Sequence, residues 1–169
     1  MEKMAKLSPV FSKTGTITAA NSSGITDGAA AVVLASEDFA RKNNLKPLAR
    51  VLAATSVGVD PRIMGIGPVP ALRKMEQKHQ LRISDFDLIE LNEAFAAQVL
   101  ACDRELHFDR SKLNVNGGSI ALGHPIGSTG TRITVTLLHE LRKRKAKRGV
   151  ATLCVSGGMG MALAIENVA

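Results

Sequence analysis

The chain has 169 residues, of which 45% are hydrophobic and 22% are charged, and its formal net charge is +7. This balance is typical of a globular protein and excludes a disordered chain. Aromatic residues make up only 3%, which disfavours nucleic-acid binding by base stacking. No apolar run reaches the ~18 residues of a membrane-spanning helix, and the N-terminal residues do not resemble a secretory signal. Two cysteines cannot build a disulfide framework, so we expect a cytoplasmic protein with no membrane partner.

Positive charge is concentrated in one run, Arg142–Arg148, which holds six cationic residues. At the end of a predicted helix, such cations complement the helix dipole. The alternative is a patch that binds phosphate or nucleic acid. We favour the solvated helix end and expect no nucleic-acid partner.

Periodicity along the chain predicts strands that alternate with helices. Continuous or alternating apolar residues mark the strands, and apolar residues three and four positions apart mark the helices. The last two strands are separated by Ser156-Gly157-Gly158, a glycine-rich hairpin turn. We therefore expect an α/β layered fold, with a mixed sheet covered by helices on both faces. The expected strands span 29–35, 48–56, 86–91, 113–115, 150–155 and 159–165, and the expected helices span 36–44, 71–79, 92–106 and 128–144.

Three polar side chains follow strands or lie in glycine-rich turns: Asn92, His124 and Cys154. Ligands of open α/β sheets bind at strand ends of this kind. Each residue also has a structural alternative. Asn92 could cap a helix, His124 could be a hydrogen-bonded loop residue, and Cys154 could be a small core side chain.

Taken together, these residue types suit acyl transfer or carbanion chemistry next to a carbonyl group. His124 can move a proton and Cys154 can act as a thiolate. The Asn92 side chain and the main-chain amide near Ser156 can donate hydrogen bonds to an oxyanion. The spacing of Cys102 and Cys154 and the absence of a Cys-x-x-Cys or His-Glu-x-x-His motif argue against a metal site. Without Gly-x-Ser-x-Gly, a serine hydrolase is also disfavoured.

Three segments resemble the C-terminal part of the thiolase family in both order and spacing. They are Asn92–Phe95 (Asn-Glu-Ala-Phe), Asn114–Gly127, which contains Gly-His-Pro, and Cys154–Gly160. Residues 21–31 and 64–70 are also similar to thiolase segments, so the resemblance covers nearly the whole chain.

The resemblance implies acyl transfer between acyl-CoA and coenzyme A, with formation or cleavage of a 3-ketoacyl-CoA. It implies that His124 activates a nucleophilic cysteine, that Asn92 holds a water in an oxyanion hole, and that Cys154 exchanges the α-proton. The main-chain amide of Ser156 would contribute to a second oxyanion hole. Coenzyme A is then a substrate, and no cofactor is expected. The positions that the resemblance places near the CoA pantetheine or the acyl group are Ser23, Ala19, Met64 and Phe95.

The family's nucleophilic cysteine belongs to an N-terminal half that this sequence does not match. Cys102 cannot replace it, because its helical spacing puts it on an apolar face with Phe95 and Val99. The resemblance implies three parts: the end of a CoA-binding loop region over 1–23, a strand and helix of the N-terminal-type core domain over 24–46, and a C-terminal thiolase domain over 47–169.

The leading hypothesis is one subunit of a two-chain thiolase, a hetero-oligomer whose N-terminal chain supplies the nucleophile. That chain would also cover the strand predicted at 29–35, because an exposed apolar strand edge promotes aggregation. One alternative is a truncated piece of a single-chain thiolase. Another is a non-catalytic CoA-binding or assembly module. Ser156 favours this last alternative, because the family usually has glycine there and a positive φ would strain serine.

Overall fold

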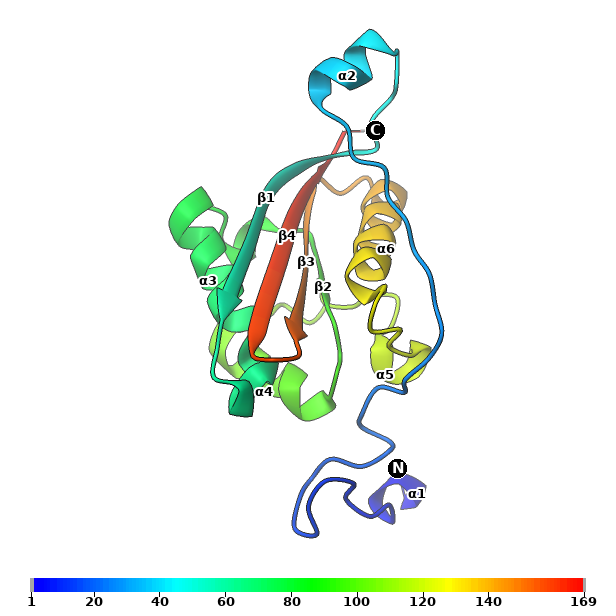
Figure 1. Ribbon diagram of the computed structural model, residues 1–169, viewed down its shortest axis with the longest axis vertical. Coiled ribbons are helices and arrows are strands. Elements are labelled where there is room, and N and C mark those ends of the chain that lie inside the picture. Colours follow the sequence, from blue (N-terminus) through cyan, green and yellow to red (C-terminus); the bar gives the residue numbers. More distant parts are fainter. Residues whose placement is uncertain (1, 169) are drawn as a thin grey trace.

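The computed structural model describes residues 2–168, and at its centre lies a four-stranded sheet in the order β1-β4-β3-β2 (Figure 1). β1 (Ala49–Gly58) pairs antiparallel with β4 (Met159–Asn167), which pairs antiparallel with β3 (Arg148–Val155). β2 (Leu88–Leu91) pairs parallel with β3. The predicted mixed sheet is therefore confirmed.

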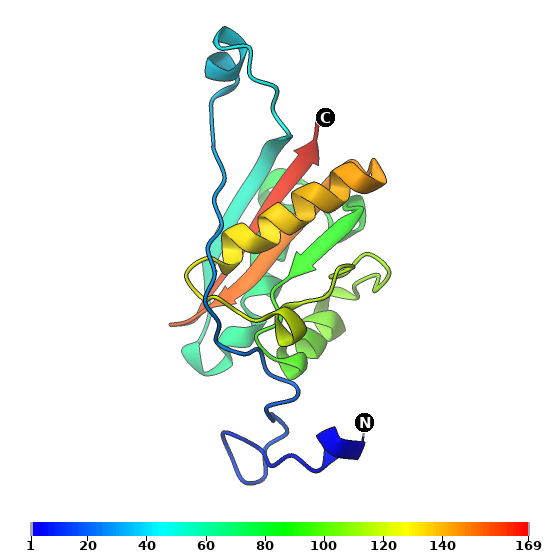
Figure 2. The same cartoon turned by 90° about the vertical axis from the view of Figure 1, so that its right-hand side faces the viewer.

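Helices cover both faces of the sheet, as the sequence predicts. α3 (Pro68–His79) and α4 (Ala96–Leu106) lie on one face, and α6 (Thr129–Arg144) crosses the other (Figures 1 and 2). The shorter helical segments are α1 (Glu2–Ala5), α2 (Glu37–Lys42), η1 (Pro61–Ile66), η2 (Ile83–Asp85) and α5 (Ser119–Leu122).

α6 attaches to the sheet through the apolar stripe that its sequence predicts. Ile133, Leu137 and Leu141 recur every four residues and are no more than 1% exposed. They pack against Leu88 of β2 and Ala151 of β3. The helix ends in Arg142, Lys143 and Arg144, where the helix dipole favours cations.

The second part of the core lies on the opposite face. Leu72 and Met75 of α3 are buried, and they cluster with Phe86, Cys102 and Val150. Helices therefore cover both faces of the sheet. Polar side chains of the strands can contact a ligand only at the strand ends.

The strand predicted at 29–35 does not form. This segment has an extended backbone outside every strand of the described chain, and it passes along the outside of the molecule toward α2 (Figures 1 and 2). Val33 and Leu34 are 95% and 78% exposed. A strand requires a neighbour to share its main-chain hydrogen bonds, and the described residues supply none. The short helix that follows is confirmed, because the Phe39 amide donates to Ser36 Oγ.

The predicted strand at 113–115 is also reduced, to one parallel bridge between Leu113 and Ile89. The pairing stops at Asn114, whose φ is +46°. A left-handed residue cannot continue a regular ladder. The Asn114 side chain instead caps the end of β2, because its Oδ1 accepts from Leu91 N and its Nδ2 donates to Leu91 O, both at 2.8 Å.

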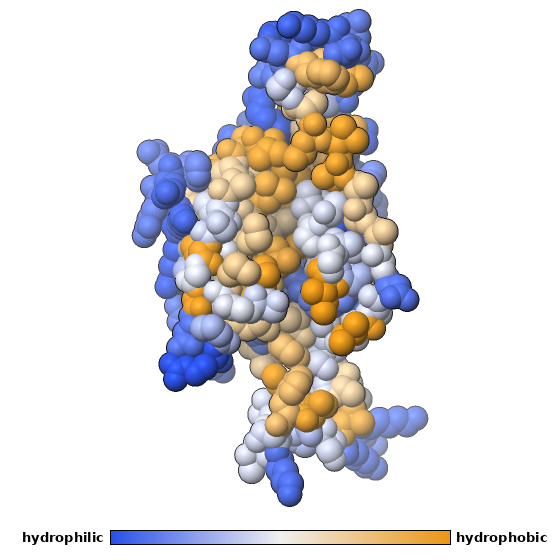
Figure 3. Space-filling view, in the orientation of Figure 1, coloured by the Kyte–Doolittle hydropathy of each residue, from blue (hydrophilic) through white to orange (hydrophobic). Residues whose placement is uncertain are grey.

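Exposed apolar side chains gather at the end of the molecule that carries α2. Figure 3 shows an apolar surface over this end of the sheet and the extended segment. The exposed large apolar residues from this part of the chain are Val32, Val33, Leu34, Phe39, Leu45, Leu48 and Val51. None of the described helices is long and apolar enough to cross a membrane.

We expect Leu137→Ala to lower the free energy of unfolding by about 2–5 kcal/mol, because it removes a buried side chain and leaves a cavity under α6. Leu100→Ala is the matched control, since Leu100 is also helical but 51% exposed. Urea unfolding followed by circular dichroism measures both. Equal effects of the two substitutions would contradict the assignment of the core.

Candidate active site

The parallel pairing of β2 with β3 brings two of the three candidate residues to one edge of the sheet. Leu91 pairs with Thr152, and the next amide, Asn92 N, donates to Thr152 O at 3.0 Å. Cys154 lies two residues further along β3, near its carboxyl end. Asn92 and Cys154 thus lie at the edge where α/β sheets bind ligands.

Asn92 is not a helix N-cap. α4 begins at Ala96, and the N-cap position belongs to Phe95, whose side chain makes no capping bond. Asn92 is instead 1% exposed and hydrogen-bonded on both sides of its carboxamide. Its Oδ1 accepts from Ser119 Oγ at 2.6 Å, and its Nδ2 lies 3.5 Å from His124 Nε2.

His124 is held in a tight turn beside the extended segment. Its amide donates to Gly24 O at 2.8 Å. The preceding Gly123 has a φ of +96°, and a Cβ there would lie 2.5 Å from Thr26, so only glycine fits. Burial, together with the positive charge of Arg132, holds the pKa of His124 below its ordinary 6.5. The neutral imidazole, the form that accepts protons, is therefore favoured at neutral pH.

Cys154 is both packed and close to the edge of the sheet. It is 7% exposed, and burial raises the pKa of its thiol. It pairs across the hairpin with Gly160, where a Cβ would lie 1.9 Å from Gly67 O. The residue before α3 therefore packs closely against the strand opposite Cys154.

The expected strain at Ser156 is absent. The left-handed residues of this hairpin turn are Gly157, with a φ of +86°, and Gly158, with a φ of +89°, and Ser156 is not among them. A Cβ on Gly158 would also lie 2.3 Å from Val59 O, whereas Gly157 has open space around it and is favoured by its positive φ alone. The serine is therefore no argument for a non-catalytic module.

Cys102 lies in the core, as its helical spacing predicts. It is fully buried, and its thiol donates to Gly65 O at 3.4 Å. Burial raises the pKa of this thiol to about 11. A reactive cysteine needs access and an accessible thiolate, so Cys102 has neither property of a nucleophile.

Two of the four residues predicted near coenzyme A lie side by side. Ser23 donates through both its amide and its Oγ to Ala94 O, the residue before Phe95. The ring of Phe95 packs edge-on against Phe11, with centroids 5.8 Å apart. Ala19 is exposed in the turn before Ser23, and Met64 lies in η1, which packs against α4.

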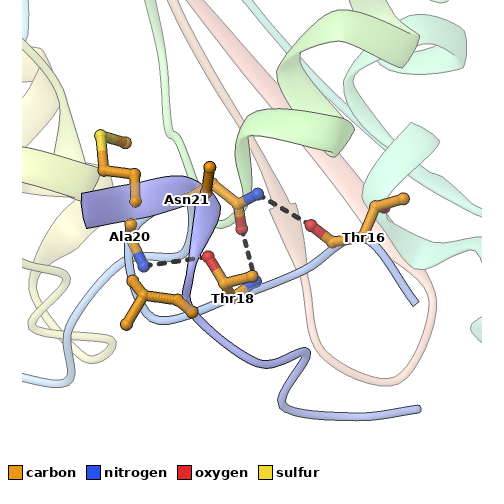
Figure 4. A pocket seen from close by; sticks show the side chains of 7 residues that line it. Thr16, Thr18, Ala20 and Asn21 are labelled. Atoms are coloured by element: carbon orange, nitrogen blue, oxygen red, sulfur yellow. Dashed lines mark hydrogen bonds between the residues drawn. The ribbon is translucent and has the colours of Figure 1, made fainter. Parts of the chain in front are cut away.

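A cavity of about 340 Å³ lies within the N-terminal segment, and none of the three candidate catalytic residues lines it (Figure 4). Its wall is a local turn in which Asn21 Oδ1 accepts from Thr18 N at 2.8 Å and Asn21 Nδ2 donates to Thr16 O at 2.9 Å. Its lining residues are Met4, Ala5, Leu7, Thr16, Thr18, Ala20 and Asn21. Because these residues include no titratable side chain, the cavity offers no acid–base chemistry.

The structure adds polar residues that periodicity did not reveal. Ser119 contacts Asn92, Thr129 contacts His124, and Arg132 donates to Ser119. Glu90, 3% exposed in β2, has its pKa raised to about 7 by burial, although Arg132 opposes this. The sequence signal that could have revealed Glu90 is its position as a charged residue inside an apolar strand. Among residues 2–168, no group of acidic, His or Cys side chains is arranged to hold a metal ion.

Comparison with known protein families identifies the class of protein to which this chain belongs. The thiolase C-terminal domain matches residues 45–167, and the thiolase N-terminal domain matches residues 1–38. The chain belongs to the thiolase family.

Curated relatives and a solved structure agree with this assignment. The chain is 54% identical to an acetyl-CoA acetyltransferase of Allochromatium vinosum, covering 99% of this chain and 42% of the relative. It is also 54% identical to human mitochondrial 3-ketoacyl-CoA thiolase, covering 100% and 43%. The crystal structure of Bacillus anthracis acetyl-CoA acetyltransferase matches with a TM-score of 0.96 and 55% identity, covering 99% and 42%. The chain therefore spans less than half the length of these relatives.

We expect the ring of His124 to titrate below pH 6.5, its ordinary pKa, because burial and Arg132 disfavour the imidazolium. An NMR titration of the histidine ring protons measures this, and His124→Asn assigns the signal by removing it. Since the folded state binds this proton less readily than the unfolded state, protonation at lower pH reduces stability. A midpoint above 6.5 would contradict the described environment.

Proposed function

We propose that this chain supplies the proton-transfer and oxyanion groups of a thiolase active site, which transfers an acyl group between acyl-CoA and coenzyme A. The observation that carries the proposal is the pair formed by Asn92 and His124. Two nitrogen atoms 3.5 Å apart can both lie within hydrogen-bond distance of a single oxygen atom. Such an oxygen is the carbonyl oxygen of a thioester or a water that contacts it.

The proposed roles follow from the protonation states. Neutral His124 accepts the proton of a nucleophilic thiol, whose sulfur then attacks the thioester carbonyl. The CoA thiolate leaves and takes that proton. In the second half-reaction, the α-proton of a second acyl-CoA moves to Cys154 in its thiolate form, which burial makes the less populated form. The resulting carbanion attacks the acyl-enzyme and releases the enzyme thiolate, which takes a proton back from Cys154. The Ser156 amide stabilises the enolate oxygen. No resident cofactor takes part, because coenzyme A is a substrate.

We infer that the nucleophilic cysteine comes from outside this sequence. Cys102 is sealed in the core, and Cys154 is assigned to proton transfer. The matched relatives are more than twice as long as the chain. Our first choice is a separate N-terminal thiolase chain that forms a hetero-oligomer with this one. The alternative is a preceding part of the same protein.

The apolar segment at 29–35 is the proposed contact with that partner. Its side chains are those of a buried strand, and its main chain is extended and unpaired by described strands. Addition of an extended segment to the edge of another sheet is a common mode of association. We therefore assign 24–46 to a core domain completed by the partner, 1–23 to a CoA-binding loop region and 47–169 to the C-terminal domain.

We propose the substrate contacts from the thiolase assignment and from the positions of the residues in the fold. Ser23 and Phe95, which lie together beside the start of α4, are proposed to contact the acyl group or pantetheine arm, as are Ala19 and Met64.

Reconstitution with an N-terminal thiolase chain tests the proposal. We expect the mixture to cleave acetoacetyl-CoA in the presence of coenzyme A, whereas this chain alone does not. Activity of the chain alone would overturn the assignment of the nucleophile to a partner. Mass spectrometry of the native complex from its source distinguishes a two-chain enzyme from a longer single chain.

Variants of the reconstituted enzyme separate the two roles. We expect His124→Ala to reduce cysteine acylation by about 10²–10⁴-fold, because the general base is lost. Cys154→Ala should leave acylation intact and block condensation. His79→Ala is the control, since His79 lies exposed at the end of α3. Near-normal condensation by Cys154→Ala would show that Cys154 is not the base.

A further inference from the structure

His124 lies within a continuous chain of polar contacts that begins at a cation and ends at a main-chain carbonyl. Its members come from the residue after β2, from α5, from the glycine-rich turn and from α6. The contacts are Arg132 Nη2 to Ser119 Oγ at 2.8 Å, Ser119 Oγ to Asn92 Oδ1 at 2.6 Å, Asn92 Nδ2 to His124 Nε2 at 3.5 Å, His124 Nδ1 to Thr129 Oγ1 at 2.7 Å, and Thr129 Oγ1 to Pro125 O at 3.0 Å.

The first end of the chain fixes the direction of its hydrogen bonds. A guanidinium can only donate, so Ser119 Oγ accepts from Arg132. The single hydroxyl proton of Ser119 is then free to point at Asn92, which must present its carbonyl oxygen. The amide protons of Asn92 consequently face His124 Nε2, and this nitrogen must carry a lone pair.

The second end of the chain of contacts independently determines which ring nitrogen of His124 carries the proton. A main-chain carbonyl can only accept, so Thr129 donates its hydroxyl proton to Pro125 O. Thr129 Oγ1 can then only accept from the ring of His124, which places the ring proton on Nδ1. Both ends therefore require the same tautomer, with Nδ1 protonated and Nε2 free.

We propose that Ser119 and Arg132 are positioning residues, which orient the Asn92 carboxamide and thereby hold His124 as the Nδ1–H tautomer. This keeps the lone pair of Nε2 on the side of Asn92. If the proposed thiolase function holds, that lone pair receives the thiol proton. The new Nε2–H then joins the Asn92 amide in donating to the thioester oxygen.

Burial explains why the chain of contacts resists rearrangement. Ser119 and Thr129 are fully buried and Asn92 is 1% exposed, so solvent cannot replace a lost partner. Reversing the Asn92 carboxamide would direct an N–H at Ser119 Oγ, which already accepts from Arg132, and would leave the Ser119 hydroxyl proton without an acceptor. An unsatisfied buried polar group costs about 1–3 kcal/mol, which favours the single orientation.

Two-bond ¹H–¹⁵N NMR spectra of the histidine rings test the proposal on the full chain, without substrate or partner. At neutral pH we expect Nδ1 of His124 to have the shift of a protonated nitrogen and Nε2 that of an unprotonated one. Ser119→Ala frees the Asn92 carboxamide to rotate. Losing one hydrogen bond of ordinary strength should then move the tautomer ratio about fivefold toward Nε2–H.

Thr55→Val is the matched control. Thr55 is also buried, and its hydroxyl donates to Ala71 O on a different part of the fold. We expect this variant to lose a buried hydroxyl and leave the His124 ring signals unchanged. If Ser119→Ala does not fold, Ser119→Cys, whose thiol is a weaker donor, shifts the ratio in the same direction.

Two results would overturn the proposal. One is a wild-type ring protonated on Nε2, and the other is a folded Ser119 variant with an unchanged tautomer ratio. Because neither measurement involves turnover, both are independent of the thiolase assay. A protein with the expected tautomer and no thiolase activity would contradict the proposed function alone.

Discussion

The short parallel pairing between β2 and β3 is the constraint on which the candidate site depends. β2 has only four residues, and its register with β3 sets Asn92 next to Thr152 and close to Cys154. A slip of one residue would turn every side chain of the strand to the opposite face. β3 is itself fixed by antiparallel pairing with β4 and by the apolar contacts of α6, so packing remote from the site determines its geometry.

The stability of the polar interior and the orientation of the proposed base have the same physical origin. Buried polar groups must find partners, because water is not available to them. Asn92 is hydrogen-bonded to Ser119 and contacts His124, and His124 is hydrogen-bonded to Thr129 of α6. The hydrogen bonds that pair these buried side chains therefore also specify which nitrogen of the imidazole can accept a proton.

The exposed apolar segment and the limited length of the chain have one explanation under the proposed function. Residues 29–35 have the composition of a buried strand, and Val33 is 95% exposed. The chain also covers only 42% of an acetyl-CoA acetyltransferase to which it is 54% identical. A surface that would be buried against the rest of a thiolase is open here, in line with a site that needs a second polypeptide segment to be complete.

The sequence by itself determined the local elements, because their signals lie within a few neighbouring residues. The spacing of Ile133, Leu137 and Leu141 predicted α6, and the two glycines after Ser156 predicted the final hairpin. Tertiary structure decided what depends on distant partners. The segment at 29–35 is not a strand because no described strand adjoins it, and Asn92 bonds to Ser119, 27 residues away, rather than capping α4. Periodicity reports which face of an element is apolar, whereas hydrogen bonds between separate elements exist only once the whole chain has closed around them.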